Sequence, residues 1–168
     1  KQTQSFKLIL YLVRHGDAEP KKPGVSDFER QLTLNGRDVT QKMAKALRKM
    51  GIKIDLVVSS PLVRAVQTAE IIRDIIGVET EILKLNELIP GSGFTSFLGI
   101  ISNLDAENIL AVGHEPYLGE FLGWFICLSK PIEFEKNSIA CVEVERFSQC
   151  GGNLKWFVNP EQILKLIE

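Results

Sequence analysis

Short apolar runs alternate along the chain with segments in which apolar residues recur at helical spacing. The runs are rich in β-branched residues and predict buried strands, and the segments between them predict helices. The strands are expected at residues 7–13, 56–59, 79–83 and 108–112, and the helices at residues 33–51, 60–77, 94–104 and from about residue 116. Strands that alternate with helices in this way form a mostly parallel sheet with helices on both faces.

The helix boundaries carry recognisable capping residues. Thr33 is expected to cap the first helix and Gly51 to end it. Ser60 followed by Pro61 predicts an N-cap with proline at the first helical position, and Gly77 is expected to end that second helix.

Two segments near the C-terminus alternate more strictly between apolar and polar residues. They cover residues 138–146 and 154–158, with Gly151 and Gly152 between them, and predict an antiparallel pair at the edge of the sheet. No repeat or flexible linker divides the chain. We therefore expect one α/β domain, residues 1–168, with three αβα layers, a mostly parallel central sheet and an antiparallel edge.

The composition is that of a globular protein without a polyanionic partner. Of the 168 residues, 45% are apolar and 24% are charged, and the formal net charge is -1. This balance argues against nucleic-acid binding. The apolar runs are too short to span a membrane, so no membrane partner is expected either.

Cysteine and histidine are scarce. The three cysteines, Cys127, Cys141 and Cys150, are an odd number without C-x-x-C spacing, which excludes a full disulfide framework and favours free thiols in a reducing compartment. With only two histidines, a metal site is not expected, and no cofactor is predicted. We expect a cytoplasmic protein. The chain does not begin with Met, which is consistent with a removed leader.

Polar residues of unusual kinds follow the four buried strands. Arg14, His15 and Gly16 come after the first strand, and Arg64 lies one helical turn beyond the second. Glu87 follows the third strand and His114 the fourth. Ligands of such sheets bind outside the carboxyl ends of the strands, so these residues mark a candidate site.

The chemistry that this set suits is phosphoryl transfer. A neutral imidazole can attack phosphorus and form a covalent intermediate, and arginine forks bind phosphate oxygens in pairs. Arg14 and Arg64 near His15 should lower the pKa of its ring, and the helix N-terminus beneath Arg64 should add positive potential. The backbone at Gly16 can approach a phosphate closely, because glycine has no side chain.

Three blocks of the sequence resemble the histidine phosphatase superfamily, whose fold is that of phosphoglycerate mutase. The blocks are Leu12-Val13-Arg14-His15-Gly16-Asp17-Ala18, Ser59-Ser60-Pro61-Leu62-Val63-Arg64-Ala65-Val66-Gln67-Thr68-Ala69 and Ala111-Val112-Gly113-His114-Glu115-Pro116. They occur in the order and spacing of the family. The short chain and the segment Arg30-Gln31-Leu32-Thr33 look most like the small SixA-type phosphohistidine phosphatases.

The resemblance implies a role for each residue of the candidate site. His15 would take the phosphoryl group, while Arg14, Arg64 and an imidazolium at His114 would stabilise its oxygens. Gly16 is expected to contribute to substrate binding. Phosphate or sulfate should bind in the same pocket, and no metal ion is needed, because the positive side chains supply the charge.

The resemblance leaves the proton donor open between two carboxylates. Glu87 follows the third strand, where larger relatives of the family carry their acid, and Asp27 in the first loop is its rival. Asp17 and Glu115 adjoin the two histidines and are expected to orient them.

The expected function is hydrolysis of phosphohistidine on a protein through a covalent phosphohistidine of the enzyme. Larger relatives insert long segments between the third strand and the second histidine, whereas the segment from Glu87 to His114 is short here. An uncovered pocket suits a phosphorylated side chain on a protein surface. The alternatives are a small-molecule phosphomonoesterase of the same superfamily and a non-catalytic phosphate-binding module.

Overall fold

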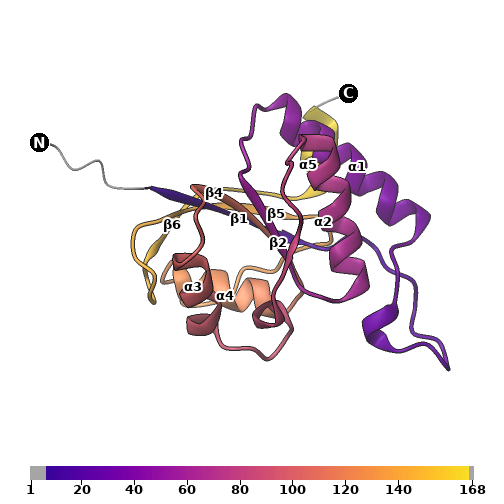
Figure 1. Cartoon of the computed structure of the whole chain (residues 1–168), viewed down its shortest axis with the longest axis horizontal. Coiled ribbons are helices and arrows are strands. Elements are labelled where there is room, and N and C mark those ends of the chain that lie inside the picture. Colours follow the sequence, from indigo (N-terminus) through magenta and orange to yellow (C-terminus); the bar gives the residue numbers. More distant parts are fainter. Residues whose placement is uncertain (1–6, 167–168) are drawn as a thin grey trace, which may run out of the picture.

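The computed structural model describes residues 7–166, which build one sheet of six strands. Its spatial order is β3-β2-β4-β1-β5-β6 (Figure 1). The strands are β1 (Leu8–Arg14), β2 (Leu56–Ser59), β3 (Leu83–Lys84), β4 (Asn108–Gly113), β5 (Ile139–Val144) and β6 (Gly152–Val158). The first four are parallel, and β5 and β6 are antiparallel to their neighbours. This confirms a mostly parallel sheet with an antiparallel edge.

Helices cover both faces of the sheet and complete the three expected layers. Helices α1 (Leu34–Lys49), α2 (Val63–Ile76) and α5 (Pro160–Leu166) lie on one face, and α3 (Phe94–Ser102) and α4 (Tyr117–Phe125) on the other (Figure 1). Two short 3₁₀ turns, η1 (Asp27–Glu29) and η2 (Asn86–Leu88), lie in loops. Within residues 7–166, none of the helices combines the length and apolar character that crossing a bilayer requires.

Strand β1 shows how the sheet separates two apolar cores. Successive side chains of a strand point to opposite faces. Leu10 and Leu12 therefore pack in the core beneath α3 and α4, whereas Tyr11 and Val13 pack in the core beneath α1 and α2. Because β1 is covered on both faces, its sequence is continuously apolar rather than alternating.

The predicted ends of the first two helices are confirmed in three of four cases. The Thr33 hydroxyl accepts the N–H of Gly36 at 2.9 Å and caps α1. Gly51 and Gly77 follow α1 and α2 with φ of +75° and +87°, the left-handed conformation that glycine adopts without strain. The predicted cap at Ser60 is wrong, because α2 begins at Val63 and its N-cap is Leu62.

Two further differences concern the periphery of the sheet. The strand predicted at residues 79–83 is reduced to Leu83–Lys84, both exposed, because β3 is an edge strand that pairs only with β2. Helix α5 was not predicted. Its seven residues bury only Ile163, and α5 packs against α1, so its apolar face is too short to give a clear helical period.

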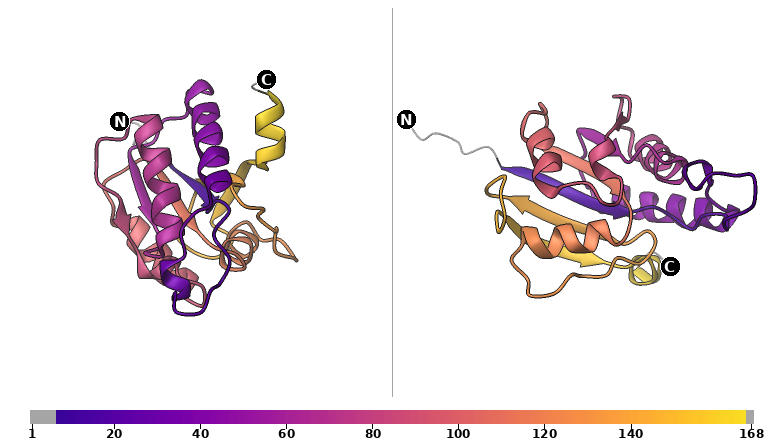
Figure 2. Two further views of the ribbon diagram at one scale, coloured as in Figure 1. Left: turned by 90° about the vertical axis from the view of Figure 1, so that its right-hand side faces the viewer. Right: turned by 90° about the horizontal axis from the view of Figure 1, so that it is seen from below.

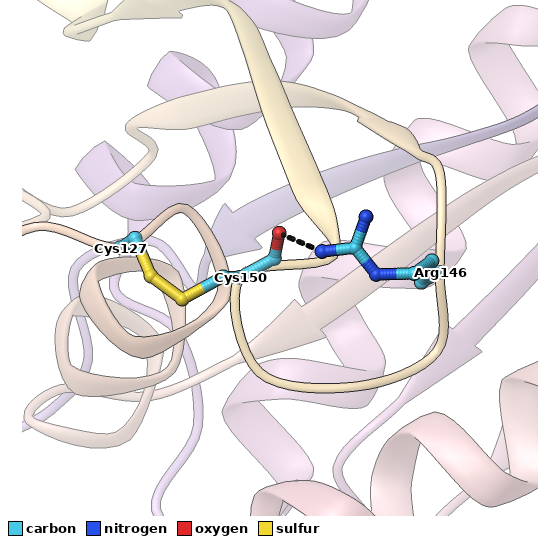
Figure 3. The surroundings of a disulfide bond; sticks show 3 residues. All are labelled: Cys127, Arg146 and Cys150. Carbon is cyan, nitrogen blue, oxygen red and sulfur yellow. Dashed lines mark hydrogen bonds between the residues drawn. A yellow bond between two sulfur atoms is a disulfide. The ribbon is translucent and has the colours of Figure 1, made fainter.

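The expectation of free thiols is wrong for two of the three cysteines. Cys127, just after α4, forms a disulfide with Cys150 in the turn between β5 and β6, with a Cα–Cα distance of 4.8 Å (Figure 3). Arg146 donates from Nη2 to the Cys150 carbonyl at 2.9 Å across that turn (Figure 3). Spacing in the sequence does not show that these segments meet. Cys141 is free and buried, as expected.

The loop that joins β1 to α1 extends past the carboxyl ends of the parallel strands (Figure 2). An isolated bridge between Ala18 and Leu32 closes its base. The N–H of Leu32 donates to the Gln67 side chain on α2 at 2.8 Å. The loop is therefore fastened to the second helix, and its tip, which holds η1, lies beside the end of the sheet where the candidate site is expected.

Candidate active site

The carboxyl ends of β1, β2 and β4 surround a cavity of about 270 Å³. Its walls come from five separate segments of the chain. The lining residues are Arg14, His15, Ala18, Arg30, Arg64, Pro90, His114, Glu115 and Lys136. Four of the residues singled out in the sequence, Arg14, His15, Arg64 and His114, are thus brought together at the edge of the sheet that the strand directions predict.

His15 presents one ring nitrogen with a free lone pair. The residue is 7% exposed, and its Nδ1 lies 2.7 Å from the carbonyl oxygen of Gly16. A carbonyl oxygen only accepts, so Nδ1 carries the proton and Nε2 does not. Burial lowers the pKa of His15 to about 4; the Gly16 carbonyl opposes this, and Arg64 and Arg14 add to it. At neutral pH the ring is therefore an uncharged nucleophile.

His114 faces His15 with its ring centroid 5.0 Å away. Its Nε2 lies 2.7 Å from the hydroxyl of Ser60, and that hydroxyl also accepts the N–H of Leu62 at 3.3 Å. The hydroxyl can donate its proton to Nε2, and in that tautomer the ring proton of His114 lies on Nδ1. Burial, then His15 and Arg64, lower the pKa of His114 to about 3. Without a bound anion, the neutral form of the His114 ring is therefore favoured at pH 7.

The two arginines are held by carbonyl and carboxylate oxygens. Arg14, the last residue of β1, donates from Nη1 to the Phe134 carbonyl at 2.8 Å. Arg64, in the first turn of α2, donates from Nη1 to the Asp27 carbonyl at 2.7 Å and from Nη2 to the Asp27 carboxylate at 3.3 Å. These hydrogen bonds are donated by Nη atoms of the two guanidiniums, and within the described residues the Nε atoms donate none.

Several buried polar atoms of this site have no hydrogen-bond partner. Within residues 7–166, four such side-chain atoms occur: Arg14 Nε, Arg64 Nε, His114 Nδ1 and Tyr117 Oη. The first three belong to residues that line the cavity. Buried donors without partners are rare in folded proteins, and each calls for a specific explanation. Three of them beside one imidazole suit an anion of phosphate size that accepts several hydrogen bonds.

Gly16 is required for a different reason from the one expected. It does not line the cavity, and its N–H donates to the Thr68 hydroxyl at 3.1 Å. A Cβ atom on Gly16 would lie 2.8 Å from the Thr40 hydroxyl oxygen and 3.1 Å from the carbonyl of Gly36. The absence of a side chain therefore lets β1 turn closely against α1.

The structure treats the two candidate proton donors differently. Asp27 does not line the cavity itself, but its carboxylate contacts Arg64 and Arg30, which do. Partial burial raises the pKa of Asp27, but Arg30 and Arg64 outweigh that effect and the pKa lies below its ordinary value. Glu87 is half-buried in η2 and does not line the cavity. Burial of Tyr117 raises the pKa of its hydroxyl, and the negative charge of Glu87 raises that pKa further.

Asp17 and Glu115 do not orient the histidines. The Asp17 carboxylate accepts the Thr33 hydroxyl at 2.9 Å and pairs with Lys136. The Glu115 carboxylate accepts the N–H of Gly119 at 2.7 Å within the first turn of α4. The groups that orient His15 and His114 are instead the Gly16 carbonyl and the Ser60 hydroxyl.

Three residues of the site with polar or charged side chains, Ser60, Arg30 and Lys136, were not among the candidate site residues from the sequence. Ser60 follows β2 directly, so its position at a strand end was a usable signal. Arg30 and Lys136 line the cavity from the β1–α1 loop and from the segment between α4 and β5. Nothing local marks them, because their nearness to His15 depends on how distant loops fold over the sheet.

The charge at the cavity comes from side chains. Arg14, Arg30, Arg64 and Lys136 line it, and Glu115 is the acidic residue among the lining set. In the part of the chain that the structure describes, no group of three His, Cys, Asp or Glu side chains is placed to hold a metal ion. The site is thus adapted to an anion through guanidinium and ammonium groups.

Comparisons with known proteins agree with this geometry. Residues 10–91, which include Arg14, His15 and Arg64, match the model of the histidine phosphatase superfamily (branch 1). The phosphohistidine phosphatase SixA of Escherichia coli (strain K12) is 29% identical over 154 residues, which are 90% of this chain and 93% of SixA. An uncharacterized protein of Picosynechococcus sp. is 33% identical over 116 residues, 67% of this chain and 69% of its own.

The fold is also that of a solved relative. A structure of the protein histidine phosphatase SixA complexed with tungstate superimposes with a TM-score of 0.81 and 28% sequence identity. The superposition covers 93% of this chain and 99% of that one.

Proposed function

The chain belongs to the histidine phosphatase superfamily, and on this premise we propose that it removes the phosphoryl group of phosphohistidine from a protein. One observation carries the proposal. Three buried donors without partners, Arg14 Nε, Arg64 Nε and His114 Nδ1, surround an imidazole whose Nε2 is unprotonated. This arrangement combines a nucleophile with donors for the oxygens of the group that it attacks.

In the first step, Nε2 of His15 attacks phosphorus. A P–N bond forms to His15 while the P–N bond of the substrate breaks, and the departing imidazole takes a proton from solvent. Arg14, Arg64 and His114 donate to the three equatorial oxygens, whose negative charge must be stabilised in the transition state. The Gly16 carbonyl holds the proton of Nδ1 and keeps the attacking ring in this tautomer.

In the second step, water attacks the phosphorus of the enzyme's phosphohistidine. The bond to His15 Nε2 breaks, inorganic phosphate forms, and the neutral ring is restored. Arg14 and Arg64 supply charge that Mg²⁺ supplies in other phosphoryl-transfer enzymes. We expect turnover to persist in excess chelator, and loss of turnover there would contradict metal-independent catalysis.

The preference for a protein substrate is supported by how little covers the site. Between Glu87 and the start of β4 the chain forms the end of η2, the nine-residue helix α3 and the turns around them. Pro90 reaches the cavity from that segment. A phosphorylated side chain on a protein surface can enter a cavity of this kind. The named activity of SixA, to which this chain is similar over most of its length, supports the same substrate class.

A turnover panel tests the proposal. The panel comprises a protein phosphorylated on histidine, a phosphoserine peptide, a sugar phosphate and phosphoglycerate, with the His15→Ala variant as the control for background hydrolysis. We expect phosphohistidine to be the best substrate. A preference for alkyl phosphates would favour a small-molecule phosphomonoesterase instead. Phosphate binding without turnover of any substrate would indicate a non-catalytic phosphate-binding module.

A phosphohistidine phosphatase and a small-molecule phosphomonoesterase differ in how much they need a proton donor for the leaving group. An alkoxide is a poor leaving group and needs protonation, whereas an imidazole leaves a P–N bond with less help. We therefore expect Glu87→Gln and Asp27→Asn to slow phosphohistidine hydrolysis by less than about tenfold, well below the loss of an essential acid. A strong loss on alkyl phosphates in Glu87→Gln, combined with a preference for them in the unmodified protein, would contradict the phosphohistidine assignment.

Cytoplasmic localisation stays a prediction. The expected free thiols argued for a reducing compartment, but Cys127 and Cys150 form a disulfide, a bond that is rare in the cytosol. Cell fractionation followed by thiol alkylation would measure both the compartment and the state of the two cysteines there.

A further inference from the structure

Asp27 accepts two hydrogen bonds from one edge of the Arg64 guanidinium. Its carbonyl oxygen accepts from Nη1 at 2.7 Å, and its carboxylate Oδ2 accepts from Nη2 at 3.3 Å. The two bonds engage the two terminal nitrogens of the guanidinium. A planar group held at both terminal nitrogens cannot rotate about its last bonds without breaking one of them.

The remaining edge of Arg64 is the one formed by Nε and the second N–H of Nη2. Nε is buried and without a partner. Nε and Nη2 lie side by side on one edge of the fork, and together they can bind two oxygens of a phosphoryl group. The Arg64 side chain, at 7% exposed, lines the same cavity as His15 and His114.

We propose that Asp27 is a positioning residue, which holds the terminal nitrogens of Arg64 so that its Nε edge faces the phosphoryl group at His15. The inference rests on the proposed function, because it takes Arg64 to bind that group. It assigns Asp27 a role other than proton donor, and it makes the β1–α1 loop part of the phosphoryl-binding machinery.

Arg30 supports this assignment by holding Asp27 in turn. Its Nε and Nη2 lie 2.9 and 2.8 Å from the Asp27 Oδ1, and its Nη1 donates to the Glu19 carbonyl at 2.9 Å. The two oxygens of one carboxylate are thus divided between two arginines. The Asp27 side chain is 47% exposed, so a simple ion pair there would contribute little to stability. Its value lies in orienting a buried guanidinium.

The test compares Asp27→Ala and Asp27→Asn with a matched control, Glu29→Ala. Glu29 lies in the same 3₁₀ turn and is exposed, so its replacement removes the same charge without touching Arg64. Asp27→Ala removes the carboxylate contact with Nη2 and keeps the backbone carbonyl that accepts from Nη1. The freed Nη2 end can then turn, and we expect kcat for phosphohistidine to fall by up to about tenfold, as expected for a coupling between contacting residues. Asp27→Asn should lose less, because its amide oxygen still accepts, and Glu29→Ala should not change kcat.

A double-mutant cycle distinguishes positioning from other roles. If Asp27 acts through Arg64, Asp27→Ala has no further effect once Arg64→Ala has been introduced. An equal loss of kcat in both backgrounds would overturn the inference, since it would show that Asp27 acts independently of Arg64. A single variant that binds inorganic phosphate more tightly and retains full kcat would also overturn it, because Asp27 would then compete with the phosphoryl group.

Failure of the inference can be told apart from failure of the proposed function. If the unmodified protein hydrolyses phosphohistidine and Arg64→Ala impairs it, but Asp27→Ala does not, the function stands and the positioning role is wrong. If the unmodified protein neither hydrolyses phosphohistidine nor binds inorganic phosphate, the proposed function is wrong and the positioning role falls with it.

Discussion

The two ends of the central sheet treat their polar groups in opposite ways. At the carboxyl ends of β1, β2 and β4, buried donors of Arg14, Arg64 and His114 have no partner. At the amino ends, the Asp55 carboxylate before β2 accepts the N–H of Glu107 at 3.2 Å and that of Asn108 at 2.9 Å, and also the Asn108 amide at 3.1 Å. The donors at the carboxyl ends are thus available to a ligand, whereas the polar groups around Asp55 at the amino ends bond to one another.

The disulfide belongs to the amino end. Leu8 at the start of β1 pairs with Val144, so the turn that follows Val144 and contains Cys150 lies away from His15 at the other end of β1. Stability and chemistry are thus separated along the strands. The comparison implies that changes at the carboxyl end alter turnover, and that changes at the amino end alter the free energy of unfolding.

The largest expected effect is the loss of turnover in His15→Ala. No covalent intermediate can form without the attacking ring, so hydrolysis should fall to background. Rapid acid-free quenching with radiolabelled substrate should place the label on His15 of the unmodified protein. Substantial turnover in the variant would refute the mechanism. It would also show that the cavity at the carboxyl ends of the strands is not the site of catalysis.

Arg64→Ala and His114→Ala should each reduce the rate by about 10²–10³. This is the usual loss when one preorganised donor to a developing charge is removed. Steady-state kinetics with phosphohistidine would measure it, and Asp55→Asn at the amino end serves as the control. The comparison of the two ends fails if Asp55→Asn reduces kcat as much as either cavity variant does.

Cys127→Ser should destabilise the protein and spare its activity. A disulfide that closes a loop with a sequence separation of 23 contributes about 3 kcal/mol by limiting the unfolded chain. Chemical denaturation of the variant should show this loss, and reductant should have the same effect on the unmodified protein but none on the variant. A large fall in kcat at a temperature where both proteins are folded would show that the two ends are coupled.

The smallest expected effect is the response of the two histidines to mild acid. With pKa values of about 4 and about 3, His15 and His114 should stay neutral between pH 7 and 5. Unfolded histidines take up protons near pH 6.5, so the free energy of unfolding is unaffected by these rings above that value. It decreases as the pH falls from about 6.5 to the folded pKa values of about 4 and about 3. NMR titration of the ring protons would check this, and a midpoint near 6.5 for either ring would contradict their burial beside the arginines.

Local patterns in the sequence were sufficient for most of the scaffold and for the core of the candidate site. Continuous apolar runs predicted β1, β2 and β4, because a strand covered on both faces needs no polar alternation. The edge strand β3 and the helix α5 escaped prediction because little of either is buried. A segment that buries few side chains carries only a weak periodic signal.

The sequence by itself determined which residue types follow the buried strands, and thereby that Arg14, His15, Arg64 and His114 would meet at one edge of a parallel sheet. That conclusion needs only strand direction and chain order, which are local properties. The tertiary structure alone decided that Ser60 orients His114, that Asp27 grips Arg64 and that Cys127 bonds to Cys150. Each of these contacts joins segments far apart in the chain, and their meeting depends on how the loops pack over the ends of the sheet.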